Sequence, residues 1–165
     1  MYGSIRCGKI LGDNRTLKMF KYNLFLLTKL PSAWFSGVRV RSVNEDKCIV
    51  DVKLKWFNQN PFKSMFWAVQ GMAAELSTGI PIIHEVNNRK IRVSMLVTSN
   101  SSKFYKKAVG RIKFECTQFN DVRRVFNSLS QDNQTEKIIL NSIGIDEQGD
   151  VVSEFSFEWS LKLKF

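Results

Sequence analysis

The chain has 165 residues, with 25 lysines and arginines against 15 aspartates and glutamates, and a formal net charge of +10. This length fits one domain rather than two, and it suffices to bury a core without disulfides or structural metals. Apolar stretches are interrupted well short of the roughly 18 residues that a spanning helix needs, and residues 1–11 lack the apolar region of a secretory signal, so we predict a cytoplasmic protein without a membrane span.

The positive charge favours anionic partners, namely a nucleic acid, an anionic membrane or a small phosphorylated ligand such as a coenzyme. A solvated, lysine-rich surface explains the same charge equally well. Three scattered cysteines, Cys7, Cys48 and Cys116, form no CxxC pair, which favours reduced thiols over a disulfide framework or a zinc site. Cys48 and Cys116 lie in apolar alternations and are expected to be small core residues.

From Arg15 onward, apolar residues recur at spacings of three and four, which predicts a helix that Asn14 caps and Pro31 ends. This region is apolar on more than one face, through residues that include Phe25 and Leu30. It could therefore pack round the body of the domain or line a ligand tunnel. We expect residues 1–35 to be an N-terminal helical extension of a single domain that covers residues 1–165.

Two strands follow, at residues 38–41 and 48–56, where apolar and charged side chains alternate. The turn-like residues 44–47 between them predict an antiparallel hairpin with one solvent-facing side.

The next segment predicts a buried helix. It opens with Ser64, a typical capping residue, and closes with Gly79, followed by Pro81. Between its ends only Gln70 and Glu75 are strongly polar, and a helix that is apolar nearly all round belongs in a core.

The remainder reads as strands at residues 90–98, 111–116, 137–145 and 151–163, with a short helix at 120–129. The last strand is expected to place one row of apolar side chains on a single face: Val151, Phe155, Phe157, Trp159, Leu161 and Leu163. One antiparallel sheet can bury such a helix only by wrapping round it, so the predicted class is α+β.

Four segments resemble hotdog-fold thioesterases, in which one curved antiparallel sheet wraps round a central helix. Residues 60–79 read Asn-Pro-Phe-Lys-Ser-Met-Phe-Trp-Ala-Val-Gln-Gly-Met-Ala-Ala-Glu-Leu-Ser-Thr-Gly and resemble the start of that helix in thioesterases of the phenylacetate-pathway type. The similarity is greater to an uncharacterised thioesterase-like branch whose helix ends in Ala-Glu-Leu-small-small-Gly. Residues 102–110, 146–152 and 155–162 are similar to that branch's approach to a strand, its last hairpin and its final strand.

The resemblance implies a hotdog fold with an extra N-terminal helix, and hydrolysis of acyl thioesters in which coenzyme A is part of the substrate rather than a cofactor. In these thioesterases the N-terminal amides of the helix hold the thioester carbonyl. A carboxylate about nine residues past a His-Gly-Gly entrance activates water or attacks the thioester, and this spacing falls on Glu75, with Phe66 and Trp67 at the entrance. Phe66 thus stands where the family has histidine.

Glu75 is a candidate functional residue even without the resemblance to thioesterases. A lone carboxylate in an apolar helix costs several kcal/mol unless it is paired, hydrated or protonated, and burial raises its pKa towards that of a useful general base. Helical spacing puts Met72 and Gly79 on its face, with room for a ligand or a second helix. A structural Glu75, paired with lysine or arginine or bonded across a subunit contact, remains an equal alternative.

The polar residues near the helix start have simpler explanations. Asn60 could offer its amide to a thioester carbonyl or an ordered water, but before Pro61 it is more often a turn residue. Ser64 is expected to be the helix N-cap, followed by amides that form an oxyanion site. His84, the single histidine, is expected in a loop, and neither a hydrolase motif nor a metal motif is present.

The densest basic cluster interleaves cations with Phe104 and Tyr105, which suits a nucleotide such as coenzyme A, or single-stranded RNA. A solvated loop is the alternative. The candidate phosphate-binding residues are Lys103, Lys106, Lys107 and Arg111.

Three functions follow. The first is thioester hydrolysis by a homodimer or tetramer with sites at the subunit interface; the apolar third strand, residues 90–98, is expected to pair with its two-fold mate. The second is fatty-acyl binding without turnover, which Phe66 and the aromatic N-terminal region favour. The third, nucleic-acid binding, is less favoured because no recognised motif is present.

Overall fold

A computed structural model describes residues 14–130 and 135–164. The elements in chain order are α1 (Asn14–Lys29), α2 (Pro31–Phe35), β1 (Arg39–Val43), β2 (Cys48–Lys53), the 3-10 helix η1 (Trp56–Asn58), α3 (Trp67–Arg89), β3 (Arg92–Phe104), β4 (Arg111–Cys116), α4 (Phe119–Ser128), β5 (Thr135–Ile145) and β6 (Val151–Lys164).

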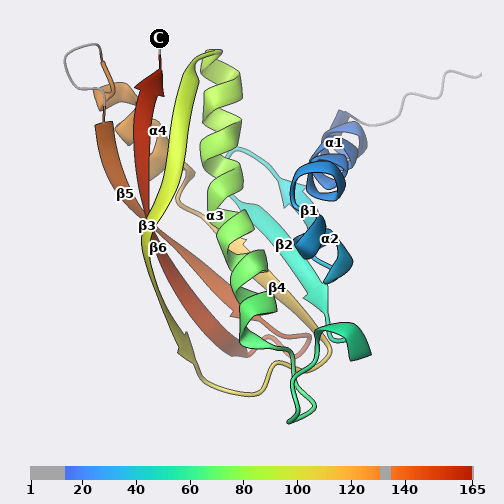
Figure 1. The fold of residues 1–165 in the computed structure, drawn as a ribbon. Coiled ribbons are helices and arrows are strands. Elements are labelled where there is room, and N and C mark those ends of the chain that lie inside the picture. The colour runs from blue at the N-terminus through green and yellow to red at the C-terminus, as the bar shows by residue number, and fades with distance from the viewer. Residues whose placement is uncertain (1–13, 131–134, 165) are drawn as a thin grey trace, which may run out of the picture.

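A single antiparallel sheet curls round α3, as Figure 1 shows. Its six strands are ordered β1-β2-β4-β5-β6-β3, so β1 and β3 form its edges. Helices α1 and α2 pack beside β1 and α3, and α4 packs against α3 and β5. The predicted α+β hotdog fold with an additional N-terminal helix is confirmed.

Alternation along β6 builds the inner face of the sheet. Phe155, Phe157, Trp159 and Leu161 are buried there, as predicted. The prediction for Val151 is wrong, because its side chain is exposed. A register shift at Gly144 and Ile145, in the pairing of β5 with β6, changes the alternation of buried and exposed side chains at this end of β6. The adjacent residues Val152 and Ser153 are consequently both buried.

Helix α3 differs from its prediction at both ends. It begins at Trp67, with Phe66 in the N-cap position and no side-chain capping bond, so Ser64 is not the cap. It also runs through Gly79 and Pro81 to Arg89. An interior proline costs about 3 kcal/mol, yet Ile80 and Ile82 are almost fully buried beside it. Burial of the second half of the helix thus outweighs the local stop signals.

Three hydrogen bonds between buried side chains fix α3 on the sheet: Ser77 Oγ to Ser142 Oγ at 2.7 Å, Trp159 Nε1 to Thr78 Oγ1 at 3.1 Å and Ser153 Oγ to Gln70 Oε1 at 2.9 Å. A Cβ on Gly79 would lie 3.4 Å from the Trp159 ring, at the short limit of ordinary van der Waals contact, so helix and sheet lie close together there. These contacts hold one face of α3 inward and leave the face with Glu75 outward.

Across 14–130 and 135–164, no helix is both long and apolar enough to cross a membrane.

Candidate functional site

Glu75 lies in a mostly apolar cleft between α3, the N-terminal helices and the edge of the sheet. The cleft has a volume of about 210 Å³ and is lined by Phe25, Leu30, Ser32, Ala33, Met72, Glu75, Leu76, Gly79, Ile83, Met95 and Trp159. The Glu75 side chain is accessible to solvent, and its carboxylate has no hydrogen-bond or ion-pair partner among the described residues. Desolvation by the surrounding groups raises its pKa above the ordinary value of 4.5. Over residues 14–130 and 135–164, Glu75 forms no salt bridge to lysine or arginine.

A second hollow, of about 410 Å³, continues the cleft along α1 and α3. The two share Phe25, Leu76 and Ile83, and the far end of the second is polar, with Tyr22 and Asn88. Phe25 and Leu30 thus form a wall of this cleft, and the lining of a ligand tunnel by the N-terminal region stays a prediction. Sequence reasoning missed Ser32 and Ala33, because nothing in a short helix after Pro31 marks its contact with α3.

His84 is not in a loop as predicted. It lies in the second half of α3, for the same reason that the helix continues past Pro81, and its side chain is buried. Its Nε2 is 3.3 Å from Asn88 Nδ2 and 3.5 Å from Glu45 Oε1, and its ring meets Phe119 edge-on. These contacts give His84 a packing role at the far end of the cleft.

Another hollow, of about 330 Å³, opens at the start of α3. It brings together several residues predicted for catalysis, oxyanion binding and phosphate binding: Asn60, Ser64, Trp67, Lys106 and Lys107. The rings of Phe66 and Trp67 meet edge-on at 6.0 Å, and both side chains are exposed.

Asn60 closes the turn that precedes α3. Its Oδ1 accepts hydrogen bonds from Phe62 N at 2.9 Å and Ser64 N at 3.2 Å, and its Nδ2 donates to Ser64 Oγ at 3.0 Å. Lys63, with φ of 58°, takes the left-handed conformation inside this turn. The turn-forming role of Asn60 is confirmed, whereas its contact with a substrate stays a prediction.

The helix start and Glu75 are well separated within one protomer. Glu75 lies eight positions after Trp67 in α3, and at 1.5 Å per residue this is about 12 Å along the helix axis. Groups that act on one carbonyl must each come within about 3 Å of it. The α3 amides and Glu75 of the same chain therefore do not converge on a single thioester.

The basic cluster divides into members with and without partners. Lys106 Nζ lies 2.6 Å from Asp146 Oδ2 and 2.7 Å from Asp150 Oδ2, and these bonds raise its pKa. Arg111 donates to the buried Asp51 at 2.6 Å. Lys107 is exposed and has no ion-pair partner in the part of the chain that the structure describes.

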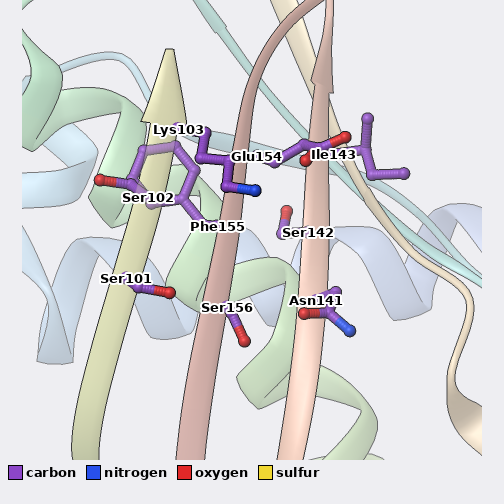
Figure 2. Close-up of a pocket in the computed structure, with 9 residues that line it drawn as sticks. All are labelled: Ser101, Ser102, Lys103, Asn141, Ser142, Ile143, Glu154, Phe155 and Ser156. Carbon is purple, nitrogen blue, oxygen red and sulfur yellow. The ribbon is translucent and has the colours of Figure 1, made fainter.

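Lys103 lies elsewhere, in an open hollow of about 400 Å³ on the sheet (Figure 2). It faces Glu154 across the β3–β6 pairing. Figure 2 shows Ser101, Ser156 and Asn141 in a row across β3, β6 and β5. Five of its nine lining residues are serine or asparagine. Lys103 thus lies in a different hollow from Lys106 and Lys107.

Cys48 and Cys116 are buried free thiols on paired positions of β2 and β4, which confirms their core placement; Cys7 lies outside the described residues. Over the described ranges, histidine, cysteine, aspartate and glutamate form no cluster of three that could hold a metal ion.

No family model matches the chain, and no curated protein matches it either. Solved structures do. A protein of unknown function from Chlorobaculum tepidum has a TM-score of 0.77 at 17% identity, covering 89% of this chain and 95% of its own. A protein from Pseudomonas aeruginosa described as a probable thioesterase has a TM-score of 0.74 at 20% identity, covering 88% and 96%. A thioesterase from Haemophilus influenzae has a TM-score of 0.66 at 10% identity, covering 88% and 90%.

These identities are low, so the similarity concerns the fold. The resemblance to phenylacetate-pathway thioesterases and the closer one to an uncharacterised thioesterase-like branch stay predictions. The chain has the hotdog fold, in common with proteins that include a probable thioesterase of Pseudomonas aeruginosa and a thioesterase of Haemophilus influenzae.

Proposed function

We propose that the protein hydrolyses acyl thioesters of the acyl-coenzyme A type, with Glu75 as general base or nucleophile. The observation that carries this proposal is the Glu75 carboxylate, which has no partner among the described residues and lies in an apolar cleft of a fold that thioesterases share. Its raised pKa supports the role, because a base is most effective when its pKa approaches the working pH.

The acyl chain would occupy the cleft between α3 and the N-terminal helices, with its carbonyl beside Glu75. The apolar lining supports this placement, since Phe25, Leu76 and Ile83 continue the cleft past the first hollow. The coenzyme would extend towards the hollow at the start of α3, where Lys107 is available for a phosphate.

The oxyanion donors would come from a second copy of the chain, because the α3 amides are too far from Glu75 of their own chain. Strand β3 supports such an assembly: it is a sheet edge of 13 residues, and an exposed edge of this length invites pairing. We expect a two-fold homodimer, or a tetramer built from it. Light scattering at micromolar concentration should give at least twice the mass of 19.1 kDa, and the mass of a monomer would contradict the shared site.

Filling the cleft should change the preference for chain length. Ser32 is exposed and lines the cleft with Glu75, so Ser32→Trp places an indole in the acyl space without disturbing the core. We expect kcat/KM for long-chain acyl-coenzyme A to fall about tenfold or more, because the chain is displaced, while short-chain substrates are hydrolysed as by the unsubstituted protein. Leu27→Trp, on an exposed position of α1, serves as the matched control. An equal loss for all chain lengths would place the acyl chain elsewhere.

The two lysines of the helix-start hollow should differ in their effect on coenzyme binding. Lys107→Ala should weaken acyl-coenzyme A binding by about threefold to tenfold and flatten its salt dependence, because it removes a cation that no described carboxylate pairs with. Lys106→Ala should have a smaller effect, since Asp146 and Asp150 already neutralise that lysine. Titration calorimetry at two salt concentrations measures both. Unchanged affinity in Lys107→Ala would instead support the alternative that the basic cluster is a solvated loop.

Fatty-acyl binding without turnover is the second candidate. It is favoured by Phe66, which occupies the N-cap of α3 with an exposed apolar ring and has no side-chain capping bond. A phenyl ring offers no donor or acceptor to a thioester, whereas the apolar cleft would hold a fatty acid equally well.

A further inference from the structure

Large apolar side chains are exposed at one end of the domain. They are Phe35, Trp56, Phe57, Phe62 and Val109, with exposed fractions of 69%, 84%, 66%, 74% and 55%. Single exposed apolar residues are normal on a surface, but a group of them marks an interaction site. We call these five residues, together with Lys53, Lys55, Lys63 and Lys107, the aromatic end.

Hydrogen bonds hold the backbone of the aromatic end together. The buried Asn58 side chain donates from Nδ2 to Ser36 O and Lys53 O, each at 2.9 Å, and so joins the end of α2, the end of β2 and η1. Leu54 N donates to Gly110 O at 2.7 Å and Met65 N to Ala108 O at 2.8 Å, which brings the segment with Val109 alongside. Figure 1 shows η1, the turn after it and the β3–β4 connection at the lower end of the molecule. The exposed rings therefore stand on a fixed support.

The charge of the aromatic end is positive. Lys53, Lys55, Lys63 and Lys107 are exposed, and none has an ion-pair partner within 14–130 and 135–164. The neighbouring carboxylates are already engaged: Asp51 holds Arg41 and Arg111, while Asp146 and Asp150 hold Lys106. Glu147 accepts a backbone hydrogen bond from Arg111. The cations that remain are free to meet an anionic partner.

We propose that the aromatic end docks on an anionic membrane surface. Tryptophan and other aromatic rings favour the headgroup level of a bilayer, and lysines beside them are attracted by anionic lipids. The rings at the aromatic end come from α2, η1 and two turns rather than from one groove, so they fit a broad apolar–polar boundary better than the bases of a single strand. This docking is a separate function from thioester hydrolysis, although Lys107 belongs to both the aromatic end and the proposed coenzyme site.

The test is co-sedimentation with vesicles of phosphatidylcholine alone and of phosphatidylcholine mixed with phosphatidylglycerol. The unsubstituted protein should bind the anionic vesicles, bind the neutral ones far less, and dissociate as salt is raised. Lys55→Gln with Lys63→Gln should lower the partition coefficient about 25-fold, at about fivefold for each lysine near an anionic surface. Trp56→Ala with Phe57→Ala should lower it at least about tenfold.

Phe20→Ala with Ile139→Ala is the matched control, because these residues are 64% and 56% exposed on α1 and β5, away from the aromatic end. The control variant should bind vesicles as the unsubstituted protein does. All variants should have the melting temperature of the unsubstituted protein. Three results would overturn the proposal. Two are equal binding to neutral and anionic vesicles, and an equal loss of vesicle binding in the control variant. The third is a change of molecular mass in Trp56→Ala with Phe57→Ala, which would assign the aromatic end to contact with a second copy of the chain. Tighter binding of a single-stranded RNA that the same variants abolish would also overturn it.

Discussion

Glu75→Gln is expected to lower acyl-coenzyme A hydrolysis at least about a hundredfold, the lower end of the usual contribution of a general base. Glutamine keeps the shape of the side chain but can neither accept the proton from water nor attack the thioester. Since no described side chain bonds to the Glu75 carboxylate, acyl-coenzyme A binding and the fold should persist. Steady-state kinetics and calorimetry on the same variant measure both.

The melting temperature of Glu75→Gln separates catalysis from a structural role. Desolvation raises the pKa of Glu75 above 4.5, so the folded state binds this proton more tightly than the unfolded state does. The group therefore costs stability as pH rises above its unfolded pKa, and Glu75→Gln removes that cost. Its melting temperature should equal or exceed that of the unsubstituted protein at pH 7, with a smaller difference at pH 4.

Glu85→Gln is the matched control on the same helix. The Glu85 carboxylate accepts from Arg89 at 2.6 Å and is largely buried, so its loss should lower the melting temperature. Hydrolysis per folded protein should stay near that of the unsubstituted protein. A fall in melting temperature of Glu75→Gln like that of Glu85→Gln would instead indicate a structural Glu75 with a partner in the assembly.

Gly144→Val is expected to give a large loss of stability. Gly144 lies where β4 pairs with β5, opposite Phe114, and this pairing joins the two halves of the sheet. A Cβ there would lie 2.7 Å from Phe114 Cε1 and 2.8 Å from Ser153 Oγ, both of which are buried. Overpacking of this kind costs about 1–3 kcal/mol, which lowers the melting temperature by about 3–10 °C for a chain of this size.

Two further variants check that explanation. Ile143→Val changes the neighbouring, exposed position and should alter the free energy of unfolding by less than about 0.5 kcal/mol. Phe114→Leu in the Gly144→Val background should recover part of the loss, because the smaller side chain makes room. Urea denaturation measures all three, and a neutral Gly144→Val would show that this part of the sheet adapts without cost.

The sequence predicts the sheet better than it predicts the central helix. Alternation is a local signal, and it placed Phe155, Phe157 and Trp159 on the buried face correctly. The end of α3 depends on tertiary contacts, because burial of Ile80 and Ile82 overrides the stop signals of Gly79 and Pro81. His84 was misplaced for that reason, and Ser64 was misplaced because the Asn60 turn engages its hydroxyl.

The site was predictable in part. Glu75 stands out because a carboxylate in an apolar helix needs an explanation, and the structure places it in a cleft. The contribution of α2 to the cleft wall could not be predicted, because nothing in the sequence around Ser32 indicates that it contacts α3. The sequence alone could not show which members of the basic cluster have ion-pair partners. The partners of Lys106 and Arg111 lie about 40 and 60 residues away along the chain, at Asp150 and Asp51.

The release of free coenzyme A thiol from acyl-coenzyme A by the unsubstituted protein, measured alongside binding of the same substrate, tests the central proposal most directly. The carboxylate of Glu75 beside the bound carbonyl should give repeated turnover, with more than one thiol released for each protomer and with loss of this activity in Glu75→Gln. Binding of acyl-coenzyme A with no release of thiol would contradict hydrolysis and leave the protein as an acyl-binding hotdog protein.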